Sequence, residues 1–392
     1  MRVIGTRAMG VRLPIISQGD SLSDIVAESL VRASQTEGLA IHESDVVAVT
    51  EAVVAKSQGN YASLVHIAAD IRAKFPGGTV GVVFPIFSRN RFLNILKGIS
   101  CGADKVFLLL SWPSDEVGNP IMDVENIDEV SDLLPKGPIP AKVFREHTGA
   151  FKHPFTAIDY IDLYQDAGDN IQVYLSNDPR DILKLTPHVL AADIHTRNLT
   201  KKRLLKAGAK TVFTLSDILS GPVDGSGFNP DYGVLGSNIA TAEQLKLFPR
   251  DCGAFVAETR EKIRKLSGVA PEVMVYGDGA FKDPARGIWE LADPVVSPAH
   301  TERLAGQPNE VKIKMLADQY LRELDGAAKA DAVKEIIRNK TGDNPYSEGT
   351  TPRKYADLLG SLCDLVSGSG DKGTPVIWVQ GYFDSYADEA DD

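Results

Sequence analysis

The chain has 392 residues, of which 43% are hydrophobic and 24% charged, and 42 Lys and Arg against 53 Asp and Glu give a formal charge of −11. This composition excludes a disordered chain, and the length allows two or three domains. The acidic balance argues against nucleic acid or an anionic membrane as the main partner, because both select clustered positive charge.

The first part of the chain alternates helical and strand-like patterns. Helices are expected over residues 21–33, 63–75 and 90–101, and buried strands over residues 45–50, 80–84 and 105–110. No segment approaches the roughly 18 apolar residues that a membrane-spanning helix needs, and the amino terminus lacks the apolar core of a signal peptide. Three separated cysteines without a CxxC pair indicate reduced thiols. We therefore expect a cytoplasmic protein with α/β or α+β layering and no membrane partner.

Prolines punctuate residues 113–140 and mark a boundary. Beyond it, strands are expected over residues 171–175, 189–193 and 210–215, separated by helices, and the Gly- and Pro-rich residues 221–230 end this compact α/β unit. The rest of the chain predicts a helix over 252–266, a strand over 272–276, a helical hairpin over 311–340, a helix from 351, a glycine-rich loop and a strand over 376–380.

Two glycine-containing loops could carry chemistry. Residues 367–375 contain three glycines and Lys372, so the backbone could cradle a phosphate, although a flexible connector explains the same residues. Asp278 follows a predicted strand with glycine on both sides, which suits a ligand of Mg²⁺ or Mn²⁺ but also an Asx-turn. Both alternatives stay open for each loop.

Basic and imidazole side chains form two further candidate groups. Arg89 and Arg91 precede a predicted helix and could hold a carboxylate or phosphate, or lie on the surface. His147, His153 and His195, the last beside Arg197, lie near acids and bases in the middle of the chain. They suggest a ligand or metal site, or separate loop residues.

The order of these segments resembles the coenzyme F-420 gamma-glutamyl ligase family. Residues 13–20 and 45–59 are similar to its LPII-type turn, following strand and VSKAEG-like segment, and residues 233–238, with the sequence GVLGSN, look like its GIDxSN motif. Residues 275–278 resemble its metal-binding strand end, and residues 355–381 its last helix, glycine loop and strand. Residues from about 102 to 231 are unmatched.

The resemblance implies a ligase that uses GTP, or another nucleoside triphosphate, and Mg²⁺ or Mn²⁺ to join L-glutamate to a small carboxylate acceptor, F-420-0-like or folate-like, through an acyl phosphate. Lys56 and Asp278 would be catalytic, and Asp278 would hold metal. The implied nucleotide contacts are Pro14, Ile15, Ile16, Ser17, Lys56, Ser237, Asn238, Gly368, Ser369, Gly370, Asp371 and Gly373. Arg89, Arg91, His147, His195 and Arg197 are candidate substrate contacts. A homodimer is also implied.

Three positions depart from the family pattern. Leu235, Gly279 and Ser369 stand where the family has metal-site residues, so a two-metal site of the family kind is not expected unchanged. This motivates an alternative, a nucleotide- or metabolite-binding protein of the same fold without ligase chemistry. A metal-dependent hydrolase or transferase centred on the middle histidines is a third hypothesis.

The expected fold is α+β, a mixed-sheet glutamyl-ligase-like fold with an inserted α/β unit. Residues 1–110 and 231–392 would form the two parts of the ligase-like domain, and residues 111–230 the inserted unit. That unit is expected to shape the acceptor site.

Overall fold

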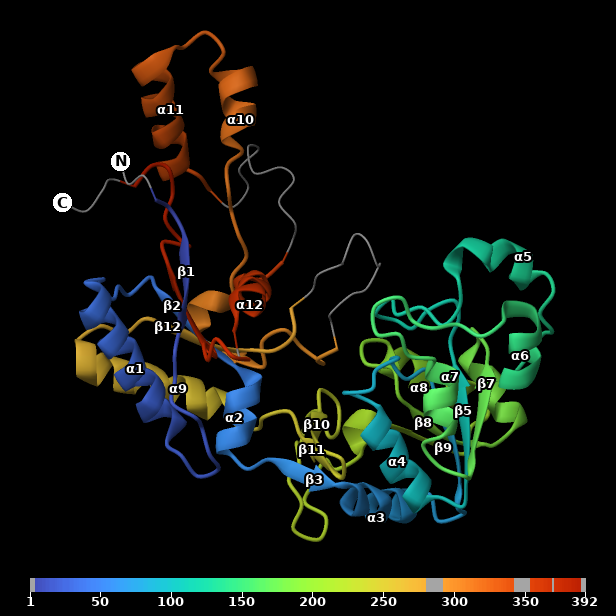
Figure 1. Ribbon diagram of the computed structural model, residues 1–392. Helices are drawn as coiled ribbons and strands as arrows, with labels where there is room; N and C mark the ends of the chain where they lie inside the picture. Colours follow the sequence, from blue (N-terminus) through green and yellow to red (C-terminus); the bar gives the residue numbers. More distant parts are fainter. Residues whose placement is uncertain (1–3, 280–291, 342–352, 369, 389–392) are drawn as a thin grey trace.

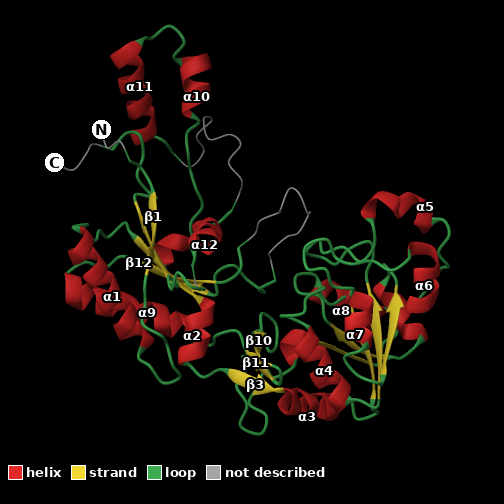
Figure 2. Cartoon of the chain, in the orientation of Figure 1, coloured by secondary structure: helices red, strands yellow, loops and turns green. Residues whose placement is uncertain are grey.

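The computed structural model describes residues 4–279, 292–341, 353–368 and 370–388, and it contains three sheets with helices packed around them (Figures 1 and 2). A five-stranded sheet and a six-stranded sheet form two separate units, and a small three-stranded sheet lies between them (Figure 1). The fold is thus a mixed α+β fold, which confirms the expected class.

The five-stranded sheet has the order β1-β14-β2-β12-β13. Its strands are β1 (Arg7–Val11), β2 (Val46–Thr50), β12 (Glu272–Tyr276), β13 (Ala299–His300) and β14 (Val376–Gln380). The three central strands are buried at every position, as expected for strands that are covered on both faces. One face packs on α1 (Leu22–Glu37) and α9 (Cys252–Ser267), and the other packs on α12 (Tyr355–Val366).

The six-stranded sheet has the order β6-β7-β5-β4-β8-β9, and all its pairs are parallel except β6 with β7. Its strands are β4 (Thr79–Val83), β5 (Lys105–Leu110), β6 (Ile139–Pro140), β7 (Ile171–Leu175), β8 (His188–Ala191) and β9 (Thr211–Thr214). The helices α3 (Leu64–Lys74), α4 (Leu93–Gly102) and α7 (Tyr160–Gln165) pack against one face, and α8 (Arg197–Lys206) packs against the other. We call this sheet with its helices the α/β unit.

The α/β unit takes β4 and β5 from the part of the chain before residue 111, which the sequence analysis assigned to the ligase-like domain. The reason is physical: periodicity identifies a short apolar run as a buried strand, but it carries no information on which sheet the strand joins.

Smaller elements lie between the two large sheets. These are α2 (Glu51–Ser57) and the three-stranded sheet of β3 (Tyr61–Ser63), β10 (Asn238–Thr241) and β11 (Gln244–Lys246), whereas α5 (Ile127–Ser131) and α6 (Ala141–Thr148) belong to the α/β unit. The expected helical hairpin contains α10 (Ile313–Met315), a π-helical turn (Leu316–Tyr320) and α11 (Gly326–Arg338), and it projects away from the sheets (Figure 1).

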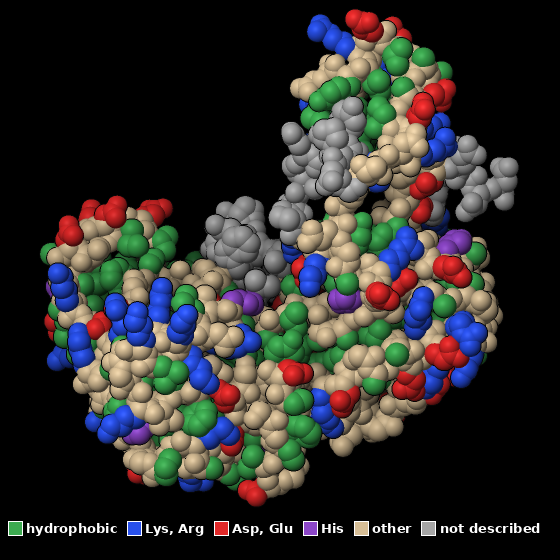
Figure 3. Space-filling model, turned by 180° about the vertical axis from the view of Figure 1, so that it is seen from behind, with side chains coloured by type: hydrophobic (Ala, Val, Ile, Leu, Met, Phe, Trp, Pro, Cys, Tyr) green, Lys and Arg blue, Asp and Glu red, His purple; other side chains and the backbone are tan. Residues whose placement is uncertain are grey.

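Charged side chains are distributed unevenly over the two units. Acidic and basic side chains are interspersed over most of the face in Figure 3, whereas a group of Lys and Arg side chains lies over the α/β unit. No helix within the described residues is long and apolar enough to cross a membrane.

Candidate active site

Two parallel strands of the five-stranded sheet end side by side and present acidic residues. In the register of β2 and β12, Thr50 pairs with Tyr276. Glu51 follows β2 directly, and Asp278 follows β12 after one glycine. Since the carboxyl ends of parallel strands are a usual position for ligand-binding side chains, this edge is the natural place for a site.

Arg91 bridges two carboxylates at this edge. Its Nη2 contacts Asp278, and its Nη1 lies 2.6 Å from Oδ1 of Asp293 and donates to the Gly236 carbonyl at 3.1 Å. The second oxygen of Asp293 accepts the backbone N–H of Asp278 at 2.7 Å, and the Asp293 side chain is fully buried. One guanidinium from the loop before α4 therefore joins the α/β unit to the five-stranded sheet.

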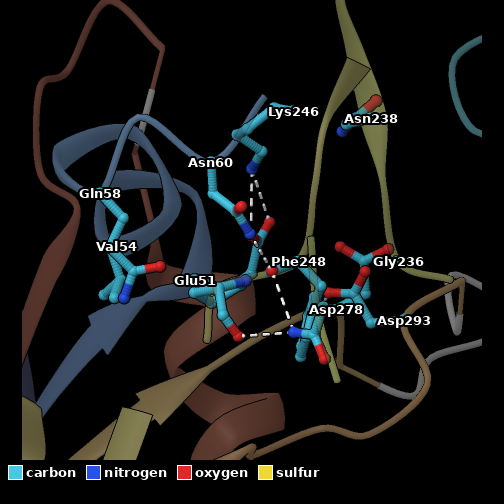
Figure 4. A network of polar contacts seen from close by, with 12 residues as sticks. Glu51, Val54, Gln58, Asn60, Gly236, Asn238, Lys246, Phe248, Asp278 and Asp293 are labelled. Carbon is cyan, nitrogen blue, oxygen red and sulfur yellow. Dashed lines mark hydrogen bonds and ion pairs between the residues drawn. The ribbon is translucent and has the colours of Figure 1, made fainter. Parts of the chain in front are cut away.

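A second ion pair completes the group. The Nζ of Lys246, on β11, lies 3.0 Å from both carboxylate oxygens of Glu51 (Figure 4). Both side chains are largely buried. We call Glu51, Arg91, Lys246, Asp278 and Asp293 the charge cluster.

Burial and mutual contacts shift the pKa values of residues in the charge cluster. Burial, helped by the nearby Asp293, raises the pKa of Asp278 to about 8, although the Arg91 guanidinium opposes the shift. Burial also raises the pKa of Glu51, against the attraction of Lys246. The pKa of Arg91 is raised because the carboxylates of Asp293 and Asp278 outweigh its burial. A carboxyl group with a pKa near 8 can exchange a proton at neutral pH, which suits a general base.

The expected nucleotide-contacting segments meet at the same end of the five-stranded sheet, where β1 ends beside the start of β14 and the end of β2. The backbone N–H of Leu13 donates to the carbonyl of Gly373 at 3.2 Å, and the N–H of Gly19 donates to the carbonyl of Ser57 at 2.9 Å. The turn at residues 13–17, the end of α2 with Lys56, and the glycine loop are thereby held together. We call these three segments the turn-and-loop edge.

Most side chains of the turn-and-loop edge are exposed. Pro14, Ser17 and Lys56 are exposed, Ile15 is 90% exposed, and Ile16 is buried in the core. In the glycine loop, Gly368 forms an antiparallel bridge with Thr374 and Gly373 has φ of +65°. Gly370 and Asp371 lie in the exposed turn between them, whereas Ser369 lies outside the described residues.

The residues at the family's metal positions do not form a metal site here. Leu235 is buried in the core of the α/β unit, Gly279 has only a backbone N–H that donates to Asp364, and Asp278 is held by Arg91. Within the described ranges, no group of three His, Cys, Asp or Glu side chains is placed to hold a metal ion. These residues do not fit the metal that the family resemblance implies.

The candidate contacts in the α/β unit are spread apart. His147 is exposed on α6, the backbone N–H of His195 donates to Glu116, and the guanidinium of Arg197 donates to the Ile194 carbonyl. His153 is buried, so the described residues give no support for a metal centre built from these histidines.

Residues 237 and 238 lie near the charge cluster. Ser237 is buried, and its Oγ has no hydrogen-bond partner among the described residues. Asn238 begins β10 and lines, with Arg89, Arg91 and Asp278, a cavity between the two units.

Sequence reasoning missed three members of the charge cluster. Glu51 had a readable signal, because it follows a predicted strand as Asp278 does. Lys246 and Asp293 had none, since each is one charged residue in a short strand or a loop and gains its role only from long-range packing.

An α+β fold with paired acids and bases at the ends of parallel strands, beside a cavity, is typical of enzymes that act on small molecules. The model of the F420-0:gamma-glutamyl ligase family matches residues 10–381, and the chain belongs to this family. This confirms the resemblance and places the protein among enzymes of the ligase type with small-molecule substrates such as glutamate. No curated protein matches the chain in a sequence comparison.

Proposed function

We propose that the protein is a nucleotide-dependent γ-glutamyl ligase that joins the amine of L-glutamate to a carboxylate acceptor. The observation that supports this proposal most is the charge cluster, which places Asp278 and Arg91 beside a cavity in a member of the ligase family.

The proposed reaction has two steps. A carboxylate oxygen of the acceptor attacks the γ-phosphorus of GTP or another nucleoside triphosphate, the bond from this phosphorus to the β-phosphate oxygen breaks, and an acyl phosphate and a nucleoside diphosphate form. The glutamate amine then attacks the acyl carbon, inorganic phosphate leaves with the bonding electrons, and the nitrogen loses a proton. The product is an amide.

The side chains suggest a division of roles. The turn-and-loop edge would hold the nucleotide, with Lys56 as the cation that neutralises its phosphates. Asp278 would accept the proton of the attacking amine, because its pKa of about 8 lies between those of an ordinary carboxyl and an amine. Arg91 would orient this carboxylate.

Two expectations from the resemblance remain predictions. Mg²⁺ or Mn²⁺ dependence is one, and since the described residues do not fit a metal site, no step is assigned to a metal. The homodimer is the other, and light scattering of the purified protein tests it.

A specific observation favours the alternative of a binding protein without ligase chemistry. Arg91 pairs with Asp278, the carboxylate that remains at the expected metal position, and with the neighbouring Asp293. In that case nucleotide would bind without turnover and with little dependence on divalent cations.

The test is incubation of the pure protein with GTP or ATP, Mg²⁺ or Mn²⁺, L-glutamate and a panel of aromatic carboxylates that includes folates. Mass spectrometry should detect an acceptor that carries one added glutamate, and Asp278→Asn should lower the rate by about 10²–10⁴-fold. Nucleotide binding without turnover in every mixture would favour the alternative, and absence of both would contradict the two proposals.

A further inference from the structure

A cavity of about 510 Å³ lies between the two units, next to the charge cluster. Its lining comes from the segment between β4 and α4, the segment between α6 and α7, Val117 and Asn119, and Asn238, Asp278 and Ala292. A volume in this range is typical of pockets for small molecules.

One donor in the cavity lining has no partner among the described residues. His153 is only 1% exposed, and its Nδ1 accepts the backbone N–H groups of Phe155 and Thr156, each at 3.2 Å. Because Nδ1 is an acceptor, the ring hydrogen must be on Nε2. Nε2 is buried and has no hydrogen-bond partner in the part of the chain that the structure describes. An unsatisfied buried donor costs about 1–3 kcal/mol, so an acceptor atom is expected in front of it.

The other polar groups of the lining also favour an anion. Arg89 is exposed and has no ion-pair partner among the described residues, and Asn119 and Asn238 add amide groups. Asp278 is the one carboxylate in the described lining, and Arg91 neutralises it. Burial lowers the pKa of His153, which keeps its ring neutral with one donor.

Aromatic rings form the remaining wall. Phe87 stacks on Tyr160 with ring centroids 5.9 Å apart, and both line the cavity. Phe155 lines it too and is 67% exposed, an unusual exposure for so large an apolar side chain. Flat rings at this position can contact a planar ligand.

We propose that this cavity binds the acceptor of the ligase reaction, an aromatic molecule that carries a carboxylate or phosphate group. His153 Nε2–H and Arg89 bind the oxyanion, and Phe155 contacts the ring. The assignment of this ligand as acceptor rests on the proposed function, whereas the binding itself does not.

Calorimetry measures binding to the full chain in the absence of nucleotide and glutamate. The binding result can therefore be interpreted even if the ligase assay fails. The aromatic probes are benzoate and phenyl phosphate. Cyclohexanecarboxylate is the non-aromatic control for benzoate, and inorganic phosphate is the control for phenyl phosphate. We expect at least one aromatic probe to bind about tenfold more tightly than its control. The aromatic probe with the higher affinity identifies the oxyanion as carboxylate or phosphate, and no binding of either aromatic probe would overturn the proposal.

Two substitutions separate the donor of His153 from its structural role. His153→Asn keeps an acceptor oxygen for the N–H groups of Phe155 and Thr156 but removes Nε2–H, and it should weaken binding about tenfold. His153→Gln places an N–H donor near Nε2 and should retain more affinity. Unchanged affinity in His153→Asn would contradict the proposed contact.

Arg89→Ala provides an independent check, because its exposed side chain leaves folding unaffected. It should weaken binding about tenfold, whereas Arg322→Ala, an exposed arginine of the hairpin, should not. The NMR signal of His153 Nε2–H should also shift when the probe is added. Equal affinities of Arg89→Ala and wild type, or an unmoved signal, would overturn the proposal even if the His153 variants unfold.

Discussion

The turn-and-loop edge and the charge cluster lie at the same end of the five-stranded sheet but are built in opposite ways. The edge consists of exposed segments that backbone hydrogen bonds hold together, such as the one from Leu13 to Gly373. The charge cluster consists of buried and partly buried side chains from five separate segments, and each charge is paired with an opposite one. Side chains of the turn-and-loop edge can be changed at little cost in stability. A substitution in the charge cluster changes both the stability of the fold and the function of the site.

Removal of a buried carboxylate should give the largest effect. Asp293→Ala would leave Arg91 with one partner fewer in a buried place and free the N–H of Asp278, so we expect a loss of about 3–5 kcal/mol in the free energy of unfolding. Urea titration followed by circular dichroism measures it.

The matched control is Glu261→Ala, which breaks the exposed pair of Glu261 and Arg264 on α9 and should cost less than about 1 kcal/mol. If both substitutions cost the same, the charge cluster is not the buried network described above.

Asp115 extends the comparison to another buried carboxylate, in the α/β unit. It accepts N–H groups of Phe87, Val117 and Asn119, and burial raises its pKa to about 6. The folded state therefore binds a proton more tightly than the unfolded state, so this group stabilises the fold increasingly as pH falls from 7 to 4. Relative to Asp115→Asn, wild type should gain about 2 kcal/mol over this range.

Urea titrations of both proteins at several pH values give the difference directly. A difference that stays constant between pH 7 and pH 4 would show that the pKa of Asp115 is not raised.

In the turn-and-loop edge, substitution of Lys56 should affect binding and not stability. Lys56→Ala should weaken nucleotide affinity about tenfold, the equivalent of about 1.4 kcal/mol, because one cation near the phosphates is lost. Its unfolding free energy should stay within about 0.5 kcal/mol of wild type, since the side chain is exposed.

Lys202→Ala, an exposed lysine of α8, serves as the charge-matched control and should bind nucleotide as wild type does. Equal losses of affinity in the two variants would indicate a general effect of charge and remove Lys56 from the site.

The smallest effect is expected for Ile15→Ser. Ile15 is 90% exposed, so stability should change by less than about 0.5 kcal/mol, while loss of its contact with the nucleotide should lower affinity about fivefold. The buried neighbour gives the opposite pattern: Ile16→Val should cost about 1 kcal/mol in stability and leave affinity unchanged. Calorimetry measures the nucleotide affinity of the two variants, and urea titration measures their free energy of unfolding.

The same contrast explains what the sequence could predict. The LPII turn and the glycine loop are contiguous, so their residues could be named before their position was known. Asp278 and Arg91 were also named, one as a metal ligand and the other as an anion contact, but their mutual contact was not. Hydrophobic periodicity located β4 and β5, yet strand pairing decided that they belong to the α/β unit. Contacts between distant segments are set by packing, which no local pattern encodes.

The most direct test of ligase chemistry at this site is to trap the acyl phosphate. Hydroxylamine replaces glutamate in a mixture of protein, nucleoside triphosphate, divalent cation and an aromatic carboxylate that binds the cavity. If the account is right, the acceptor hydroxamate accumulates together with nucleoside diphosphate, and Lys56→Ala forms it more slowly. Nucleotide that binds but yields neither hydroxamate nor diphosphate with any acceptor would contradict the account.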